Sequence, residues 1–530
     1  MRTDRTRRQN LRRAALQENL LADLPRGRNA DHIGVPPHSH FEPIKNLLAT
    51  ESLQFEASKN LDAKRFLGVL NGVVVEGARL SDGRTTRYVH RGVPIGVGDD
   101  RHCVLLAGSR AGKGRNILIP AQILASRDTS LFSLDPKGTS AYLTARYRAE
   151  VLNQRVVVFD PMEICGTHTR RYRASLNPID LMLRKEPRRL VFTAQIVAEA
   201  SIISGESRDR HWDDCSRDFV AGILVHVATH ERYAKNRDLV TVWHLISEAT
   251  APDPNDPARA WLETEMLANE SFGGFVRTAA RNFYGRTGGE FSSVLSNLRK
   301  HTNWFGYESL KPCLIGKTVD PCELKSSSAA WYVAVEAMQM ANFRGWLRMM
   351  VQLALAAHEE EPKQHGPNTQ FLLDEYHVLG TLSCVESAAG LMAGLGVSLH
   401  TVLQDLAQLQ ASHSKTWETF IANSGVVQAF GIADHTTAEY LSKRLGQAQT
   451  LSRSTTSPTF DQATRDAASG ENWSVSVHPL MTPDEIIRYF GRNDPLQRSL
   501  VLRPGYRPMI CQRVCYDQHE IFEGRYYAGE

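Results

Sequence analysis

The chain has 530 residues, of which 42% are hydrophobic and 23% are charged. This length exceeds one ordinary core and corresponds to roughly three to four domains of about 150 residues. The balance of apolar and charged residues is that of a folded protein and excludes a largely disordered one. No run of about 18 apolar residues occurs, so the sequence predicts no membrane span. Eight scattered cysteines indicate reduced thiols in a cytosolic compartment.

The first residues form a local polycation. Arg2 to Arg13 contains six arginines and one acid, Asp4, whereas the whole chain has a net charge of +4. The rest of the protein is therefore close to neutral, and this tail has the charge to contact nucleic acid or an anionic membrane surface. A solvated, frayed terminus is the plain alternative. Residues 1–90, which include this tail, are otherwise only weakly patterned.

From about residue 91, short strand patterns alternate with helical ones. Unbroken short apolar runs are typical of parallel strands that are buried on both faces. The alternation predicts an α/β fold with a mainly parallel sheet and helices on both of its faces. The predicted strands are Arg101 to Ala107, Leu131 to Leu134, Val156 to Phe159, Phe371 to Leu373 and Val397 to Val402.

Two stretches interrupt this pattern. Residues 188–301 lose the strand signals and show helical periodicity, as in Asp214 to His230, which predicts an all-α domain inserted into the α/β domain. The α/β domain then comprises residues 91–187 and 302–530. Within it, residues 447–471 are rich in Ser, Thr, Ala and Asp, and we expect a flexible surface loop there.

The most specific motif lies between a predicted strand and a predicted helix. Its sequence, AGSRAGKG, resembles the phosphate-binding Walker A loop, GxxxxGK[ST]. Glycines let the backbone curl so that N–H groups face phosphate oxygens, and Lys113 can reach the β- and γ-phosphates. The positive end of the following helix dipole favours the same anion. The candidate nucleotide-binding residues are Ala107, Gly108, Ser109, Arg110, Ala111, Gly112, Lys113, Gly114 and Arg115.

Two positions depart from the usual loop. Ala107 replaces the first glycine, which is a mild steric change, and Gly114 replaces the hydroxyl residue that normally ligates Mg²⁺. Ser109 lies at the wrong position to substitute simply for it. A glycine-rich turn without a phosphate ligand is the alternative interpretation. A dinucleotide-binding motif is set aside, because the spacing GxxxGKG differs from GxGxxG.

A second motif, FLLDE, is a hydrophobic strand that ends in two acids, as in the Walker B pattern. We expect Asp374 to hold Mg²⁺, directly or through water, and Glu375 to polarise the attacking water. Gln404, at the end of the next predicted strand, is a candidate for sensing the γ-phosphate or positioning water. These three residues and Lys113 are the predicted catalytic set, with ATP and Mg²⁺ as cofactors.

With these motifs the sequence resembles the TraG/TraD-type coupling proteins of type IV secretion systems, from about His102 to Tyr527. In that family alanine at the first loop position and glycine after the lysine are both frequent. One departure is Thr139, where the family usually has glutamate. The other matching blocks are Leu134–Gly138, Val157–Pro161, Asn177–Leu181, His211-Trp212, Gln404–Leu409, Asn423, Phe430, Thr437, Ser442, Gly446 and Leu480–Ile487.

The resemblance implies a RecA-like P-loop domain split by an all-α domain, with ATP bound between the subunits of a homo-hexamer. It implies an ATPase that delivers single-stranded DNA with a relaxase, or a protein substrate, to a conjugative channel. Relaxosome and type IV secretion proteins are the expected partners. Most members begin with two membrane spans, and we expect an anchor-less, cytoplasmic relative. Peripheral association with the inner membrane would then use a partner or the segment Arg2 to Arg13.

Candidate DNA contacts lie in the predicted helical domain. The stretch RTAARNFYGR interleaves Arg277, Arg281 and Arg286 with Phe283 and Tyr284, a pattern suited to backbone contacts with aromatic support. The two arginines that flank the loop lysine are candidates for contact with phosphate of the nucleotide or of DNA. A ring ATPase is also expected to use an arginine finger. Arg348 and Arg444 are considered for that role, and neither is assigned.

Two alternative functions stay open. One is a soluble DNA translocase of the FtsK/HerA group, against which the blocks after the Walker B motif argue. The other is a receptor that keeps ATP as a structural ligand and recruits cargo through its all-α domain without turnover. Gly114 favours the receptor, whereas Asp374 and Glu375 favour catalysis.

Overall fold

The computed structural model describes residues 39–79, 81, 85–184, 186–203, 210–248, 253, 255–361, 367–382, 384–386, 392–456 and 470–529. They divide into two compact units. Unit 1 comprises the chain up to Ser126 together with Leu399–Tyr526, and unit 2 comprises Arg127–Ser398 with the chain end from Tyr527. The arginine-rich segment Arg2 to Arg13 lies outside the described residues.

Unit 1 is built on a mixed sheet with strand order β4-β1-β15-β14-β11-β5-β10. Its parallel part is β11-β5-β10, in which Leu106 pairs with Leu403 and Ala107 with Phe430. The other strand pairs are antiparallel. The strands are β1 (Arg65–Leu70), β4 (Val93–Val97), β5 (His102–Ala107), β10 (Val397–Leu403), β11 (Ser424–Phe430), β14 (Arg498–Leu502) and β15 (Met509–Gln512).

A short loop after β5 leads into a helical segment. The turn Gly114–Leu118 has π-helical hydrogen bonding and continues into α3 (Ile119–Leu124), so the candidate phosphate loop lies between a strand and a helix as the sequence predicts. The other α-helices in the described part of unit 1 are α2 (Ile44–Ala49), α16 (Leu406–Ser412), α17 (Trp417–Ala422), α18 (His435–Leu445) and α20 (Pro483–Tyr489).

The described residues between 39 and 90 contain more regular structure than the weak sequence pattern suggests. All six residues of β1 are buried, and Leu67 and Leu70 pack with Ile95, Val501 and Cys511 in the core of unit 1. A two-stranded sheet, β2 (Val73–Arg79) and β3 (Thr85–His90), follows. Most residues of β2 are exposed, which explains why this segment shows no clear hydrophobic period.

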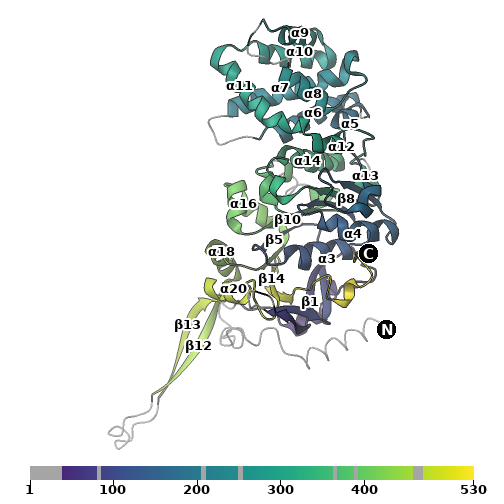
Figure 1. Ribbon diagram of the computed structural model, residues 1–530. Coiled ribbons are helices and arrows are strands. Elements are labelled where there is room, and N and C mark those ends of the chain that lie inside the picture. Colours follow the sequence, from purple (N-terminus) through teal and green to yellow (C-terminus); the bar gives the residue numbers. More distant parts are fainter. Residues whose placement is uncertain are drawn as a thin grey trace, which may run out of the picture. The chain divides into compact units, whose positions relative to one another are not determined.

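A long two-stranded ribbon replaces much of the expected flexible loop. β12 (Gln447–Thr456) and β13 (Gly470–Pro479) pair antiparallel from Gln447–Pro479 to Thr456–Gly470 and project from the part of unit 1 that carries α18 and α20 (Figure 1). The expectation of a loop is therefore wrong for residues 447–456 and 470–471. Residues 457–469 lie outside the described residues.

Unit 2 contains a fully parallel sheet with strand order β9-β6-β8-β7. The predicted strands that fall in this unit are confirmed, and β8 is an additional one. In β9 and β6, Leu373 pairs with Leu134, so the residues that follow both strands lie at the same edge. The strands are β6 (Ser130–Asp135), β7 (Arg155–Phe159), β8 (Ala329–Ala334) and β9 (Thr369–Leu373).

A group of helices spans Pro187–Thr302 within unit 2, where the sequence predicts only helices. Its central member is α7 (Arg210–Thr229), which contacts α5, α6, α8, α10 and α11 and is buried from Phe219 to Ala228. Among the described residues, the α-helices of unit 2 are α4 (Thr139–Glu150), α5 (Pro178–Arg184), α6 (Pro187–Ser201), α7, α8 (Leu239–Glu248), α9 (Pro257–Ala268), α10 (Ser271–Tyr284), α11 (Gly288–Thr302), α12 (Lys311–Leu314), α13 (Glu323–Ser326) and α14 (Arg344–Glu360).

Among the described residues, no helix combines the length and the apolar character that crossing a bilayer requires. The eight cysteines are free in the structure.

Candidate functional site

The loop after β5 curls at the amino end of a helical segment. The Ala111 N–H donates to the Gly108 carbonyl at 3.1 Å, and the Asn116 N–H donates to the Gly112 carbonyl at 2.8 Å. Arg110 and Gly112 have left-handed backbone conformations, with φ of 56° and 89°. A curled loop before a helix presents the backbone N–H groups and the dipole end that phosphate binding requires.

A close contact between two glycines fixes the shape of this loop. A Cβ atom on Gly108 would lie 2.2 Å from the carbonyl oxygen of Gly431, which follows β11, and a Cβ on Gly431 would lie 2.2 Å from the Cβ of Ala111. Both positions therefore require glycine. A Cβ on Gly114 would meet nothing within 4 Å, so no steric conflict excludes a hydroxyl residue there.

Arg513 holds the loop from within the core of unit 1. Its Nη1 donates to the Ala111 carbonyl at 3.1 Å, and its guanidinium lies 4.4 Å from the centre of the Phe430 ring. Burial lowers the pKa of Arg513 to about 10, which leaves the side chain charged at neutral pH. No sequence motif points to Arg513 or to Gly431. The available signal is only that each stands just after a buried strand.

Arg115 is engaged by the C-terminal segment. Its Nε and Nη2 donate to the two carboxylate oxygens of Asp517 at 2.7 and 2.6 Å, and its guanidinium lies 5.1 Å from the centre of the Tyr88 ring. The side chain that was expected to contact phosphate is therefore committed to another partner. Ser109 and Arg110 are exposed.

A cavity of about 480 Å³ opens beside the loop within unit 1. Its walls come from the loop, from β3 and from the chain between α20 and β14. Tyr88, Arg492, Asn493 and Gln497 contribute an aromatic ring, a cation and two amides to its lining. A cavity of this size with a few polar groups is typical of a small-molecule site.

Asp374 and Glu375 follow β9 in unit 2. Glu375 has a left-handed conformation with φ of 51°, and its N–H donates to Asp374 Oδ1 at 3.0 Å. Its carbonyl accepts from the Val378 N–H at 2.9 Å, within the short 3₁₀ helix η9 (Tyr376–Leu379). A strained backbone at a non-glycine residue is common at functional sites.

Asp135 is a third carboxylate at this edge of unit 2. It ends β6, the neighbour of β9, and its Oδ2 accepts from the Ala141 N–H at 2.9 Å. Burial, together with the charge of Asp374, raises the pKa of Asp135 to about 7. The sequence marks it only as part of a family block, because a single acid at a strand end has no distinctive pattern.

Gln404 directly follows β10 in unit 1. Since Leu403 pairs with Leu106, Gln404 lies at the same sheet edge as the start of the phosphate loop. Its N–H donates to Gln408 Oε1 at 2.9 Å, and Asp405 caps α16 by accepting from the Gln408 N–H. The two predicted site residues at this edge, Gln404 and Ala107, are thus neighbours.

The arginines predicted to contact DNA lie on or just after α10. Arg277 pairs with Glu270, and Arg286 donates to Glu290 Oε1 at 3.0 Å, whereas Arg281 is exposed. The prediction that Phe283 and Tyr284 support DNA contacts is wrong. Phe283 and Tyr284 are buried, and the Phe283 ring stacks on Phe219 at 3.8 Å between ring centres, because these aromatics form the core of the helical group.

Arg348 and Arg444 have different surroundings. Arg348 is 4% exposed and inside unit 2, so in this conformation it cannot act as a finger that reaches another subunit. Arg444 is half-buried on α18, and its Nη1 donates to the Tyr440 hydroxyl at 3.4 Å.

A family model described as type IV secretory system conjugative DNA transfer matches residues 51–527. The conjugal transfer protein TraG of Escherichia coli is 23% identical over 482 residues, which cover 86% of this chain and 72% of that protein. Protein VirD4 of Rhizobium radiobacter is 24% identical over 440 residues, which cover 82% of this chain and 59% of that protein.

Solved structures with the same fold include the bacterial conjugative coupling protein TrwBΔN70 in an unbound form, with a TM-score of 0.58 and 15% identity. The match covers 86% of this chain and 95% of that one. Plasmid coupling protein TrwB in complex with ADP and Mg²⁺ has a TM-score of 0.55 and 16% identity, with 85% and 94% of the two chains covered. These likenesses support a RecA-like P-loop fold.

Proposed function

Because the chain belongs to the type IV secretory system conjugative DNA-transfer family, we propose that it hydrolyses ATP to drive DNA into a conjugative channel. The observation that carries this proposal is the curled loop before α3, whose shape depends on the Gly108–Gly431 contact. Family membership favours a coupling protein over a soluble translocase of the FtsK/HerA group.

Residues of unit 1 bind the nucleotide. The loop from Ala107 to Arg115 supplies backbone N–H groups to the phosphates, and Lys113 neutralises the β- and γ-phosphates. The adjacent 480 Å³ cavity accepts the nucleoside. Gln404, which follows the strand next to β5, senses the γ-phosphate or orients water.

Residues of unit 2 supply the acids. Asp374 holds Mg²⁺ and Glu375 accepts a proton from the attacking water. The described residues contain no group of three or more His, Cys, Asp or Glu side chains that could hold a metal. This fits Mg²⁺, which binds through one or two carboxylates together with substrate phosphates and water. When bound, the ion neutralises charge on those phosphates. The raised pKa of Asp135 keeps part of its population uncharged at neutral pH, which reduces repulsion of Asp374.

The working form is a homo-hexamer that acts on single-stranded DNA delivered with a relaxase and contacts type IV secretion proteins at the inner membrane. Arg281, which is exposed on α10, remains a DNA contact in this proposal, whereas Arg277 and Arg286 would first have to leave their glutamate partners. A non-hydrolysing receptor is the second candidate, favoured by Gly114 in place of a hydroxyl residue.

Steady-state ATP hydrolysis, with and without single-stranded DNA, separates these candidates. Wild-type turnover that rises with DNA, and its loss in Glu375→Gln with ATP binding retained, is the expected result. Glu359→Gln is the matched control, because Glu359 is an exposed glutamate of α14 in the same unit. Tight ATP binding without turnover under any condition would favour the receptor, and turnover retained by Glu375→Gln would exclude Glu375 as the base.

A further inference from the structure

Two arginines of α14 bind the end of η9 and the residues that follow it. Arg344 Nε donates to the Val378 carbonyl. One turn later, Arg348 Nη1 donates to the carbonyls of Leu379 and Thr381 at 2.7 and 2.8 Å. The carbonyls of Val378, Leu379 and Thr381 are therefore bound by side chains of α14.

The same Arg348 guanidinium also binds the carboxyl end of α6. Its Nε donates to the Ala200 carbonyl at 3.0 Å, and its Nη2 lies 3.5 Å from the Glu199 carbonyl. The last carbonyls of a helix lack partners within the helix and form the negative end of its dipole. A guanidinium is suited to this position because its donors are held in a rigid, planar fork. One buried side chain thus joins the end of α6 to the end of η9.

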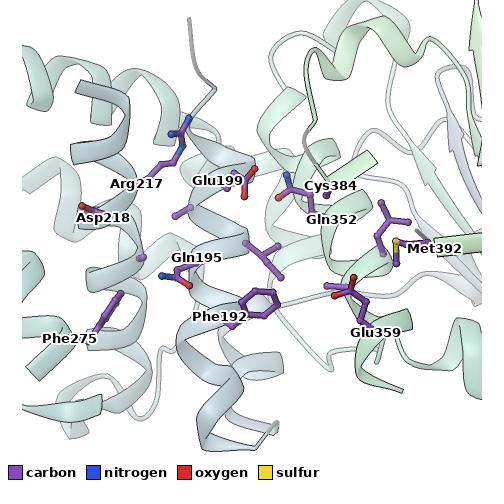
Figure 2. A pocket seen from close by; sticks show the side chains of 15 residues that line it. Phe192, Gln195, Glu199, Arg217, Asp218, Phe275, Gln352, Glu359, Cys384 and Met392 are labelled. Carbon is purple, nitrogen blue, oxygen red and sulfur yellow. The ribbon is translucent and has the colours of Figure 1, made fainter. Parts of the chain in front are cut away.

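A cavity lies beside α6 and α14, two helices that also contact each other. The cavity, of about 750 Å³, is lined by Gln195 and Glu199 of α6 and by Gln352 and Glu359 of α14, and Figure 2 shows these side chains around it. Near the other end of α6, Arg189 Nη1 lies 3.6 Å from Glu360 Oε1. The contacts of Arg348 and Arg189 therefore tie both ends of α6 to α14.

The path from Arg348 to the candidate general base is short. Glu375 is followed directly by η9, and its carbonyl accepts from the Val378 N–H at 2.9 Å. Tyr376 is fully buried and anchors the start of η9. If the hydrogen bonds from Arg348 to Leu379 and Thr381 change, the turn that positions Glu375 therefore shifts as well.

We propose that Arg348 is a positioning residue that sets the orientation of Glu375 according to the position of α6. Rearrangement of the helical group, for instance when cargo binds to it, then changes the rate of hydrolysis without contact with the nucleotide. The inference rests on the proposed function, because it requires Glu375 to act on the attacking water. The helices between Pro187 and Thr302 would thus control the rate of ATP hydrolysis through the Arg348 guanidinium.

The first test replaces Arg348 by lysine and by methionine in the full chain. A misplacement of about 1 Å at a reacting group can lower a rate about a hundredfold, and we expect kcat for ATP to fall at least about tenfold in both variants. The Kd for ATP should change less than about threefold, because the phosphate loop is in unit 1. Lysine keeps the charge but cannot bind both segments in the manner of a fork, so it should not restore kcat.

Arg148 provides a matched control. It is as buried as Arg348, lies on α4 of the same unit, and donates through Nε to Gln154 Oε1 at 2.6 Å. Arg148→Lys should lower thermal stability to a similar extent and leave kcat within about threefold of wild type at a temperature where both variants are folded. If the two lysine variants lose kcat equally, Arg348 has only a structural role and the inference is wrong.

Hydrogen exchange gives a second readout, whose first part uses only the wild-type protein. Adding a non-hydrolysable ATP analogue should change protection in residues 376–382 and, together with it, at the end of α6, residues 195–202. Arg348→Lys should keep the first change and lose the second. A nucleotide-dependent change in 376–382 without any response of α6 would overturn the inference. Absence of ATP hydrolysis by the wild type would instead refute the proposed function itself.

Discussion

The contact between Gly108 and Gly431 provides a quantitative test of the phosphate loop. In Gly108→Ala the new Cβ would lie 2.2 Å from the Gly431 carbonyl oxygen. The usual distance of such a carbon–oxygen contact is about 3.3 Å, so the loop and the end of β11 have to separate by about 1 Å. Overpacking of this kind costs about 1–3 kcal/mol of unfolding free energy.

The same shift moves the N–H groups that we assign to the phosphates. A hydrogen bond to a charged group contributes about 1.5–3 kcal/mol, and each 1.4 kcal/mol corresponds to about a factor of ten in affinity. Loss of one such bond in Gly108→Ala should therefore raise the Kd for a fluorescent ATP analogue about tenfold to a hundredfold. Equilibrium titration measures this change, and denaturant unfolding measures the loss of stability.

Gly114→Ala is the control for this experiment. Its Cβ meets nothing within 4 Å, and the residue starts a helical segment, where replacing glycine by alanine stabilises by up to about 1 kcal/mol. We expect unchanged or higher stability and unchanged nucleotide affinity. The reasoning is refuted if Gly108→Ala is as stable as wild type and binds the analogue as tightly, or if both alanine variants lose affinity equally.

Three further perturbations test other features. Lys113→Ala should abolish measurable nucleotide binding in the same titration while leaving the unfolding midpoint of the unliganded protein within a few degrees of wild type; retained affinity would exclude Lys113 as the phosphate ligand. His358 is fully buried, and burial lowers its pKa to about 4, below the value of about 6.5 expected in the unfolded chain. The contribution of neutral His358 to the free energy of unfolding is therefore fully present above pH 6.5. It falls by about 1.4 kcal/mol per pH unit as the pH drops from 6.5 toward 4. His358→Gln should lack this component in denaturant unfolding across that range, and parallel curves for the two proteins would contradict the assignment. Deleting residues 2–13 should weaken binding to single-stranded DNA or anionic liposomes more at low than at high salt; an equal effect at all salt concentrations would mean that the tail's charge does not matter.

Five parallel strands, β5, β6, β7, β9 and β10, could be predicted because each contains a short apolar run, as in the fully buried β5 and β9. The parallel strands β8 and β11 were not predicted. The antiparallel strands were harder to predict from the sequence. β2 is mostly exposed, and the β12–β13 ribbon is defined by a backbone ladder of ten residue pairs, a feature that hydrophobic patterning does not report. Composition alone therefore suggested a loop where a ribbon forms.

In the candidate site too, some residues could be predicted from the sequence and others could not. Lys113, Asp374 and Glu375 belong to local motifs, and the residue spacing of these motifs is enough to predict a nucleotide site. Gly431 and Arg513 act through contacts between distant parts of the chain, and Arg513 binds a loop carbonyl 402 residues before it. Phe283 was misjudged for the converse reason, because an aromatic residue beside arginines has the same pattern whether it faces solvent or the core of a helical group.

The C-terminal segment has a genetic consequence. Arg513 donates to the Ala111 carbonyl, and Asp517 receives the two donors of Arg115. A premature stop codon just before Arg513 would leave every recognised nucleotide-binding motif intact in the translated product. It would nevertheless remove two of the groups that hold the phosphate loop. Late nonsense and frameshift alleles should therefore behave like lesions in the loop itself, although a motif-based view of the gene would class them as mild.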